Sequence, residues 1–416
     1  MNINRQSYLK QLDAKKHNGM IKIITGLRRS GKSYLLFRLF YEKLLSQGID
    51  ESHIIRIQLD GLEYIDLRDK IALFKNIKAK IIDSKMYYCF LDEIQFVEGF
   101  EEVLNSLLHI PNLDVYVTGG NSRFLVKDVI TEFRGRGDEI RVFPLSFEEY
   151  FSVCDCDFET AWMDYYTYGG LPLVASMKEH KEKSDYLKSL FSKVYITDVL
   201  DRYKIRNKKE FESLLDVLAS SIGSLSNPLN IANTFKTKEK SSITNKTVSS
   251  YISYLEDAFL TQSVQRYDIK GRKHIGANKK NYFTDIGLRN ARLNFRQLEE
   301  THIMENIIYN ELRYRGYDVD IGTVEYNKTD KNGQNKKIQL ECDFVANRGT
   351  KRIYIQSAYD VSSLEKKEQE ENSLMRISDS FRKIIIQRHQ VIPHYDDNGI
   401  FIICLKDFLL NNEIDL

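Results

Sequence analysis

The chain has 416 residues, a length that accommodates roughly two to four domains. Its 61 Lys and Arg residues nearly balance 59 Asp and Glu residues, so the net charge of +2 excludes a globally basic protein and leaves only local patches as nucleic-acid contacts. The sequence contains no stretch near the ~20 apolar residues that cross a bilayer, and it opens without an apolar signal region. With five cysteines and no zinc-binding spacing, we expect a cytoplasmic protein with reduced thiols and no membrane partner.

A glycine-rich loop near the N-terminus carries the most specific motif. Gly26–Ser33 follows the apolar run Met20–Thr25 and precedes Tyr34–Phe40, which gives G-x-x-x-x-G-K-[ST] between a strand and a helix. Such a loop turns backbone N–H groups toward phosphate oxygens, so we expect Lys32 to reach the β- and γ-phosphates of ATP and Ser33 to bind Mg²⁺. A chance glycine loop is the alternative, but the flanking strand and helix argue against it. The predicted ATP-binding residues are Gly26, Leu27, Arg28, Arg29, Ser30, Gly31, Lys32, Ser33 and Tyr34.

Two acidic residues end the next strongly apolar segment. A strand is predicted at 53–59 and a helix at 69–83. Then Tyr87–Leu91 runs directly into Asp92 and Glu93. Asp92 would hold Mg²⁺ directly or through water, and Glu93 would polarise the attacking water. An apolar run followed by two acids is weak evidence alone, but about sixty residues after a P-loop it indicates a Walker B segment, and the glutamate favours hydrolysis over binding alone.

The next predicted strand, 114–118, leads into the polar sequence Gly-Gly-Asn-Ser. At the end of this strand Asn121 would lie between the P-loop and the Walker B segment, where it could orient water or contact the γ-phosphate. Thr118 is the competing candidate for this role. An ordinary turn explains Gly-Gly-Asn equally well.

A pair of arginines precedes the last predicted core strand, Ile140–Phe143. Arg134 and Arg136 lie in a flexible glycine context, so either could serve as an arginine finger, supplied by the same chain or by a neighbouring copy. Two solvated surface arginines are the competing interpretation.

Four motifs together resemble one family. They are Thr-Gly-Leu-Arg-Arg-Ser-Gly-Lys-Ser at 25–33, Phe-Leu-Asp-Glu-Ile-Gln at 90–95, Thr-Gly-Gly-Asn-Ser at 118–122, and Arg-Gly-Arg-Gly-Asp-Glu-Ile-Arg-Val-Phe-Pro-Leu-Ser-Phe at 134–147. In this order they are similar to bacterial and archaeal AAA-type ATP-binding proteins that carry a C-terminal domain of unknown function. The resemblance implies an α/β P-loop core over residues 1–150, with a parallel sheet in the order 5-1-4-3-2 and an ATPase site of the additional-strand-catalytic-glutamate type.

Residues 151–208 are predicted to form a helical lid, with helices at 162–168 and 183–206. Between these helices, Gly169–Val174 is similar to the Gly-x-Pro motif of signal-transduction ATPases, which are relatives of AAA proteins. The similarity implies that Pro172 packs on the adenine base. A helix stop followed by a proline start accounts for the same residues.

Residues 209–292 have the pattern of a winged helix, with three helices followed by two wing strands. Its wing carries one acid, Asp268, and six basic residues: Arg266, Lys270, Arg272, Lys273, Lys279 and Lys280. Such a patch could follow a DNA backbone. However, the segment 247–258 at the recognition-helix position has no arginine to read guanine. A lid or protein contact with a solvated wing is therefore the favoured interpretation.

The C-terminal part, 293–416, resembles the restriction-endonuclease-like fold. In that fold a helix Glu, a strand Asp and a Glu-x-Lys hold Mg²⁺ and activate water, and the matching positions are Glu305, Asp343 and Gln356–Ala358. A neutral Gln replaces a carboxylate and Ala removes the lysine, so we expect a domain without nuclease chemistry that serves docking or oligomer contacts. Two lysines elsewhere could replace the missing one, Lys351 and Lys383.

The sequence as a whole predicts an α/β multidomain switch that hydrolyses ATP. Nucleotide would order the lid and winged helix against the core, and hydrolysis would release them to act on a partner, with a homo-oligomer as one form. Two other classes stay open. One is an ATP-gated DNA-binding regulator, or a mobile-element or defence factor, and the other is a metal-dependent nuclease.

Overall fold

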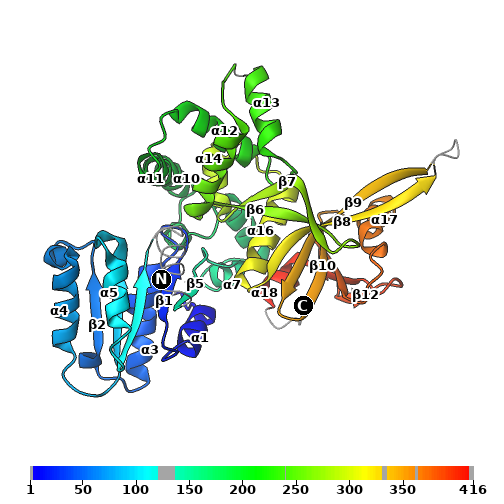
Figure 1. Cartoon of the computed structure of the whole chain (residues 1–416). Coiled ribbons are helices and arrows are strands. Elements are labelled where there is room, and N and C mark those ends of the chain that lie inside the picture. Colours follow the sequence, from blue (N-terminus) through cyan, green and yellow to red (C-terminus); the bar gives the residue numbers. More distant parts are fainter. Residues whose placement is uncertain (1–2, 120–135, 239, 330–334, 361–363, 412–416) are drawn as a thin grey trace. The chain divides into compact units, whose positions relative to one another are not determined.

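The computed structural model describes residues 3–119, 136–238, 240–329, 335–360 and 364–411 (Figure 1). The chain divides into two compact units. Unit 1 comprises Met1–Leu145, Leu171–Ser176 and Asp257–Phe259, and unit 2 comprises Ser146–Gly170, Met177–Glu256 and Leu260–Leu416.

Unit 1 is built on five parallel strands in the order β2-β3-β4-β1-β5, which confirms the predicted order 5-1-4-3-2. The strands are β1 (Ile21–Thr25), β2 (Ile54–Gln58), β3 (Tyr87–Asp92), β4 (Leu113–Thr118) and β5 (Gly137–Arg141). The central strands β1, β3 and β4 are buried along their whole length, as expected where helices cover both faces of a parallel sheet. Because all five strands run the same way, their carboxyl ends meet at one edge of the sheet, where ligands bind in open α/β sheets.

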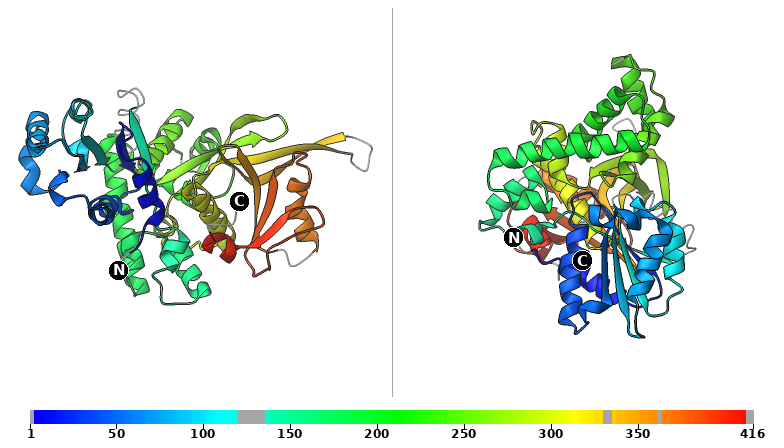
Figure 2. Two further views of the ribbon diagram at one scale, coloured as in Figure 1. Left: turned by 90° about the horizontal axis from the view of Figure 1, so that it is seen from below. Right: turned by 90° about the vertical axis from the view of Figure 1, so that its left-hand side faces the viewer.

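Helices lie on both faces of this sheet (Figure 2, right). On one face, α4 and α5 bury Leu73 and Leu104 in the main hydrophobic core. On the other face, Phe40 packs against Phe90 and Tyr116, with ring centroids 5.8 and 5.2 Å apart. The helical elements of unit 1 are α1 (Gln6–Ala14), α2 (Lys32–Tyr34), the π-helical η1 (Leu35–Phe40), α3 (Tyr41–Ser46), η2 (Glu51–His53), η3 (Leu62–Arg68), α4 (Lys70–Lys80), η4 (Ile94–Phe96), α5 (Phe100–Leu107) and α9 (Pro172–Ala175).

The last strand of the core begins earlier than the sequence indicated. β5 pairs with β1 from Gly137 opposite Ile21 to Arg141 opposite Thr25, so the expected strand at 140–143 is wrong at both ends. Its acidic start argues against a strand on propensity alone. In the structure Asp138 forms an ion pair with Lys15, the residue that follows α1, which stabilises the acid at this edge.

Unit 2 combines helices with a mixed eight-stranded sheet of order β12-β13-β11-β10-β9-β8-β6-β7. The strands are β6 (Thr261–Asp268), β7 (Lys273–Phe283), β8 (Asp318–Thr329), β9 (Asn335–Arg348), β10 (Lys351–Ala358), β11 (Arg382–Gln387), β12 (His394–Tyr395) and β13 (Phe401–Cys404). The helices are α7 (Phe147–Phe151), α8 (Phe158–Tyr168), α10 (His180–Leu190), η6 (Phe191–Ile196), α11 (Thr197–Arg202), α12 (Lys208–Ser220), α13 (Pro228–Lys238), α14 (Asn245–Asp257), α15 (Ile286–Arg292), α16 (Glu300–Tyr314), α17 (Leu364–Met375) and α18 (Leu405–Leu410). The helix α16 packs against this sheet (Figure 2, left).

The elements of the predicted winged helix occur in the expected order, with α12, α13 and α14 followed by the β6–β7 hairpin. The hairpin is not a separate wing, however. Arg266–Asp268 of β6 pair in parallel with Ile321–Thr323 of β8. The sheet of the C-terminal part therefore continues across the boundary predicted at residue 292.

The short helix α15 holds several segments of unit 2 together. Asp285 at its N-cap accepts a hydrogen bond from the Gly170 N–H at 2.9 Å. Asn290 donates to two main-chain carbonyls near the end of α8, both at 2.9 Å. Gly287 approaches the main chain after α8 so closely that a Cβ atom would lie 1.9 Å from a carbonyl oxygen. Gly169 is held by α8, through its N–H bond to the Tyr165 carbonyl at 2.8 Å, and the segment that follows is fixed by α15.

Candidate functional site

The glycine-rich loop lies at the carboxyl edge of the parallel sheet, between β1 and α2. Gly26 has φ +131°, and a Cβ atom there would lie 2.1 Å from the carbonyl oxygen of Val142. Gly31 has φ +95°. Only glycine adopts these conformations without strain, so the two glycines of the motif are required by the backbone path itself.

Lys32 is buried beneath this loop, with 5% of its surface exposed. Its Nζ donates hydrogen bonds to the carbonyl oxygens of Gly26 and Leu27, both at 3.0 Å. Burial lowers the pKa of Lys32 to about 8, although the nearby Glu93 and Asp92 favour its charged form. A buried ammonium held by only two neutral acceptors is well suited to a polyanionic ligand such as a triphosphate.

Three elements bring polar oxygens together next to the loop. The Ser33 hydroxyl donates to Asp92 Oδ1 at 3.0 Å, which joins the P-loop to the end of β3. The Thr118 hydroxyl, at the end of β4, donates to the same oxygen and accepts the Glu93 N–H at 3.1 Å. Hydroxyl and carboxylate oxygens are the donors that Mg²⁺ prefers.

A magnesium ion at this point would need further oxygens from phosphate or water, as is usual for Mg²⁺. Among the residues that the structure describes, no group of three or more His, Cys, Asp or Glu side chains could hold a metal ion. Ser33 and Asp92 supply two such oxygens, so the pair fits a metal whose other ligands are phosphate or water oxygens.

Glu93 follows β3 in a left-handed conformation, with φ +51° and ψ +50°. For a residue other than glycine this conformation costs on the order of 1–3 kcal/mol. The Glu93 carboxylate accepts a hydrogen bond from the amide of Gln95. Gln95 was part of a recognised motif, but sequence reasoning gave it no role, because only the turn at Glu93 brings the two side chains together.

The other residues predicted for the loop are placed as follows. Ser30 is buried, and its hydroxyl has no partner among the described residues. Arg29 is exposed with φ +62°, whereas Arg28 is half-buried. Asn121 and Arg134 lie outside the described residues. Thr118, the alternative to Asn121, is held by Asp92 and Glu93 and so serves to position them.

Arg136 is exposed and immediately precedes β5. Its carbonyl oxygen accepts the N–H of Ile21, the first residue of β1, at 2.9 Å. β1 runs from this point toward the P-loop, so Arg136 lies at the amino edge of the sheet, opposite the site. The structure does not bring this arginine to the loop of its own chain. Arg141 is the last residue of β5, at the carboxyl edge, and the sequence interpretation gave it no role although it lay within the predicted strand.

A cavity of about 340 Å³ lies beside the loop within unit 1. It is lined by Ile3, Arg5, Gly31, Tyr34, Leu145, Pro172, Leu173 and Ser176. A Cβ atom on Gly31 would lie 3.7 Å from Pro172 Cγ, so the proline borders the loop closely. Pro172 is also the first residue of α9, which is the competing structural role expected from sequence.

The N-terminal segment contributes to this cavity in a way that sequence reasoning missed. The buried Arg5 guanidinium donates to the carbonyl oxygens of Ser30 and Phe143, at 3.3 and 2.7 Å. These contacts hold the segment before α1 against the loop. No local motif identifies Arg5. The apolar Ile3, which is also buried, was the one nearby signal that the N-terminal segment packs against the protein.

A second charged cluster occurs in unit 2, where nuclease-like positions were expected. The Lys280 Nζ of β7 lies 2.8 Å from Glu305 and 2.6 Å from Glu341, with Asp343 at 3.9 Å. The Tyr282 hydroxyl donates to Glu305 at 2.5 Å. Burial alone would lower the pKa of Lys280, but the surrounding carboxylates raise it. A buried ammonium therefore stands among the three carboxylates.

The lysines proposed to complete this cluster do not do so. Lys383 donates to the carbonyl oxygen of Ile377 at 2.7 Å, and Lys351 is an exposed residue at the start of β10. The lysine that contacts the carboxylates of this cluster is Lys280, which the sequence analysis counted with the basic wing. The patch predicted on the wing is accordingly smaller. Its exposed cations are those of the turn between β6 and β7: Lys270, Arg272 and Lys273.

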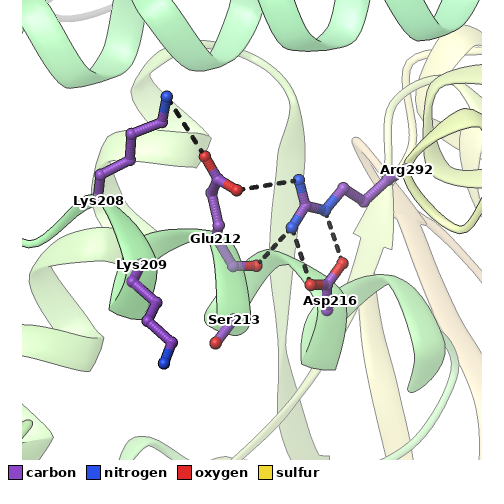
Figure 3. A pocket seen from close by; sticks show the side chains of 6 residues that line it. All are labelled: Lys208, Lys209, Glu212, Ser213, Asp216 and Arg292. Atoms are coloured by element: carbon purple, nitrogen blue, oxygen red, sulfur yellow. Dashed lines mark hydrogen bonds and ion pairs between the residues drawn. The ribbon is translucent and has the colours of Figure 1, made fainter.

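A third hollow, of about 420 Å³, lies between α12 and α15 (Figure 3). Its centre is the Arg292 guanidinium, which donates to the Asp216 carboxylate at 2.6 and 2.8 Å and to the Glu212 carbonyl at 3.0 Å. Lys208 pairs with the Glu212 carboxylate at 3.7 Å. Arg292 and Lys208 are paired with the two acids of α12, so these contacts join α12 to α15, and Lys209 is the remaining cation of the lining.

None of the helices that the structure describes is both long and apolar enough to cross a membrane.

Comparison with known proteins gives matches over both parts of the chain. Residues 18–151 match the model of an AAA domain, and residues 159–299 match that of a domain of unknown function. An uncharacterized protein of Haemophilus influenzae is 32% identical over 414 residues, covering 98% of each chain. An uncharacterized protein of Methanocaldococcus jannaschii is 28% identical over 332 residues, which cover 76% of this chain and 70% of the relative. A solved structure of a Walker-type ATPase of Pyrococcus abyssi shares the fold, with a TM-score of 0.51 at 16% identity over 70% of this chain and 96% of that chain.

Proposed function

Because the chain belongs to the AAA-type P-loop ATPases whose ATPase domain is followed by a domain of unknown function, we propose that it hydrolyses ATP to ADP and phosphate with Mg²⁺. One observation carries the proposal. The hydroxyls of Ser33 and Thr118 converge on one oxygen of Asp92, and Glu93 is the next residue. This arrangement joins a phosphate loop, hard oxygen donors for a metal and a candidate base at one edge of the sheet.

Each residue has a distinct task in this reaction. Ser33 and Asp92 would hold Mg²⁺, which when bound neutralises charge on the phosphates. Lys32 would exchange its two carbonyl acceptors for β- and γ-phosphate oxygens. Glu93 would orient the attacking water and accept its proton, with its carboxylate held by Gln95. We keep Asn121 as a further candidate for contact with that water or with the γ-phosphate.

The cavity beside the loop is the proposed adenine site. Pro172 and Tyr34 line it, and Arg5 fixes its floor to the loop through Ser30. If the base binds here, Pro172→Ala should weaken ATP binding several-fold and leave inorganic tripolyphosphate binding unchanged. Pro111→Ala makes the same change at an exposed position outside the cavity and is a matched control. Equal weakening of ATP and tripolyphosphate by Pro172→Ala would place the base elsewhere.

Hydrolysis itself is tested by removing the proposed base. Glu93→Gln should bind ATP with the affinity of the unchanged protein and lose turnover by about 10²–10⁴-fold, the usual contribution of a general base. Lys32→Ala should lose nucleotide binding as well. Glu98→Gln makes the same chemical change at an exposed position five residues away and should keep full turnover. Unchanged phosphate release by Glu93→Gln would rule out the proposed role.

We propose that hydrolysis works as a switch, in which nucleotide state governs a partner through unit 2, and that copies of the chain assemble. The position of Arg136 at the amino edge means that it would act as a finger only on a neighbouring copy. A mixture of Lys32→Ala and Arg136→Ala proteins should then be more active than the sum of the two alone. No gain on mixing would leave Arg136 without this role.

A second candidate function is an ATP-gated DNA-binding regulator. It is supported by the three exposed cations in the turn between β6 and β7. ATPase rates measured with and without DNA, together with particle mass in ATP, would separate a DNA-stimulated enzyme from a self-assembling one.

A further inference from the structure

A hollow of about 370 Å³ in unit 2 is lined by the turn between β6 and β7 and by the turn between β9 and β10. Three cations line it, and they come from two segments of the chain: Arg272 from the first turn, and Lys351 and Arg352 from the start of β10. Tyr267 and Phe381 add two aromatic rings to the same wall. Basic and aromatic side chains therefore share one concave surface, a combination that neither turn shows in the sequence alone.

The Arg352 guanidinium is fixed within this wall. Its Nε donates to Asn347 Oδ1 at 2.8 Å. Its centre lies 5.2 Å from the Tyr267 ring and 5.5 Å from the Phe381 ring. Phe381 nevertheless keeps 40% of its surface exposed. A held guanidinium beside an exposed ring offers flat surfaces on which a planar group can stack.

The acids near this surface are occupied by the protein itself. Asp379 accepts hydrogen bonds from the Tyr354 hydroxyl at 2.6 Å and from the Phe381 N–H at 3.2 Å. Asp268 accepts the Gly271 N–H at 2.9 Å within the turn. Three cations and one acid, Asp379, line the hollow, so its net charge is positive, and this charge extends along the turn through the exposed Lys270 and Lys273.

We propose that this hollow binds a single strand of nucleic acid, with phosphates on Arg272 and Lys351 and an unpaired base stacked on Phe381 and Arg352. The proposal goes beyond ATP hydrolysis and does not depend on it. Stacking favours a single strand, because the bases of a duplex are already stacked on one another. An acidic peptide would use the cations but would gain nothing from the exposed ring and guanidinium plane.

The cations of this hollow lie on other elements than α14, the helix at the position expected to read DNA. The helix α14 contains one lysine, Lys246, together with Glu256 and Asp257. None of the three hollows described above is lined by a residue of α14. Binding at the hollow therefore predicts that substitutions on α14 leave the affinity unchanged.

The test uses the full chain and fluorescence anisotropy with a labelled mixed-sequence 12-mer. Four further probes are its RNA equivalent, its DNA duplex, an abasic strand of equal length, and polyglutamate. The base-bearing single strands should bind tightest, and the ratio of DNA to RNA affinity identifies the natural strand. Phe381→Ala should lower affinity about tenfold, and Phe381→Tyr should restore it. Arg272→Ala should reduce the slope of log affinity against log salt by about 0.7, whereas Phe381→Ala should not.

Lys246→Ala is the matched control for loss of an exposed cation, and it should bind as the unchanged protein does. Three results would each overturn the proposal. The first is an abasic strand or polyglutamate that binds as tightly as the base-bearing strand. The second is a duplex that binds more tightly than its single strand, and the third is full affinity in Phe381→Ala. A loss with Lys246→Ala equal to that with Arg272→Ala would move the contact to α14. Melting curves of each variant separate these outcomes from loss of folding.

Discussion

Thr118 provides a sharp test of the catalytic geometry, because it touches both acids of the site and was not itself expected to bind magnesium. Thr118→Val keeps the branched shape at a fully buried position in β4 and removes only the hydroxyl. That hydroxyl donates to Asp92 and accepts the Glu93 N–H at 3.1 Å. The substitution therefore frees the carboxylate that faces Ser33 and leaves the backbone of the proposed base without its acceptor.

The expected size of the effect follows from these two bonds. A hydrogen bond to a charged group contributes about 1.5–3 kcal/mol, and each 1.36 kcal/mol corresponds to a factor of ten in rate. If the whole contribution orients Asp92 for catalysis, turnover should fall by about 10–150-fold. The unsatisfied Glu93 N–H should also lower the free energy of unfolding by about 1–3 kcal/mol.

The assay measures phosphate release against magnesium concentration, and nucleotide binding without magnesium. Thr118→Val should lower kcat and raise the magnesium concentration that gives half-maximal rate, while metal-free nucleotide affinity stays the same. Thr118→Ser keeps a hydroxyl and should recover most of the rate. A Thr118→Val protein with unchanged kcat and magnesium dependence would show that the convergence on Asp92 does not govern catalysis.

Three further outcomes follow from buried charges. Burial lowers the pKa of Lys32 to about 8. ATP affinity should therefore be independent of pH below pH 8 and fall about tenfold per pH unit above it. Lys32→Arg should show no such fall, and titration calorimetry measures both affinities. Burial raises the pKa of Asp285 to about 6, so the folded state binds more protons than the unfolded state between pH 4 and 6. The free energy of unfolding should therefore decrease by about 3 kcal/mol as the pH rises from 4 to 6. Asp285→Asn should remove this pH dependence in denaturant titrations. Lys280→Met should cost about 3–5 kcal/mol at pH 7, with part of the loss recovered when Glu305→Gln is added, as thermal melts would show.

The core of the fold follows from local sequence signals to a large extent. The P-loop and the Walker B segment can each be predicted from a short stretch of sequence. The glycine spacing places Lys32 in the loop, and the apolar run that ends in two acids places Asp92 at the end of a strand. The hydrogen bond between Ser33 and Asp92, which joins the two segments, does not follow from local sequence. It depends on the order of β1, β3 and β4 in the sheet, which the resemblance to a family implied and which spacing alone does not determine.

Two residues show what local composition leaves open, because the surroundings of each depend on pairing distant in the chain. Arg136 was a candidate finger because of its glycine neighbours, but the register of β5 against β1 places it at the far edge. Lys280 was counted with the wing, yet its partners come from α16 and β9. In both cases the local composition was read correctly, and the missing information was which strand lies beside which.

The parallel sheet also constrains how a neighbouring copy could complete the ATPase site. Its carboxyl edge carries the P-loop and the Walker B acids, while its amino edge carries the exposed Arg136 and the buried ion pair between Lys22 and Asp114. A two-fold contact whose axis passes through one edge of the sheet would place identical edges together and leave Arg136 away from the partner's nucleotide. A head-to-tail contact instead brings the amino edge of one copy to the carboxyl edge of the next, the arrangement that generates rings or filaments. If Arg136 acts on ATP, its position requires a contact that brings the amino edge of one copy to the carboxyl edge of another, and a head-to-tail contact does this in every pair of neighbours.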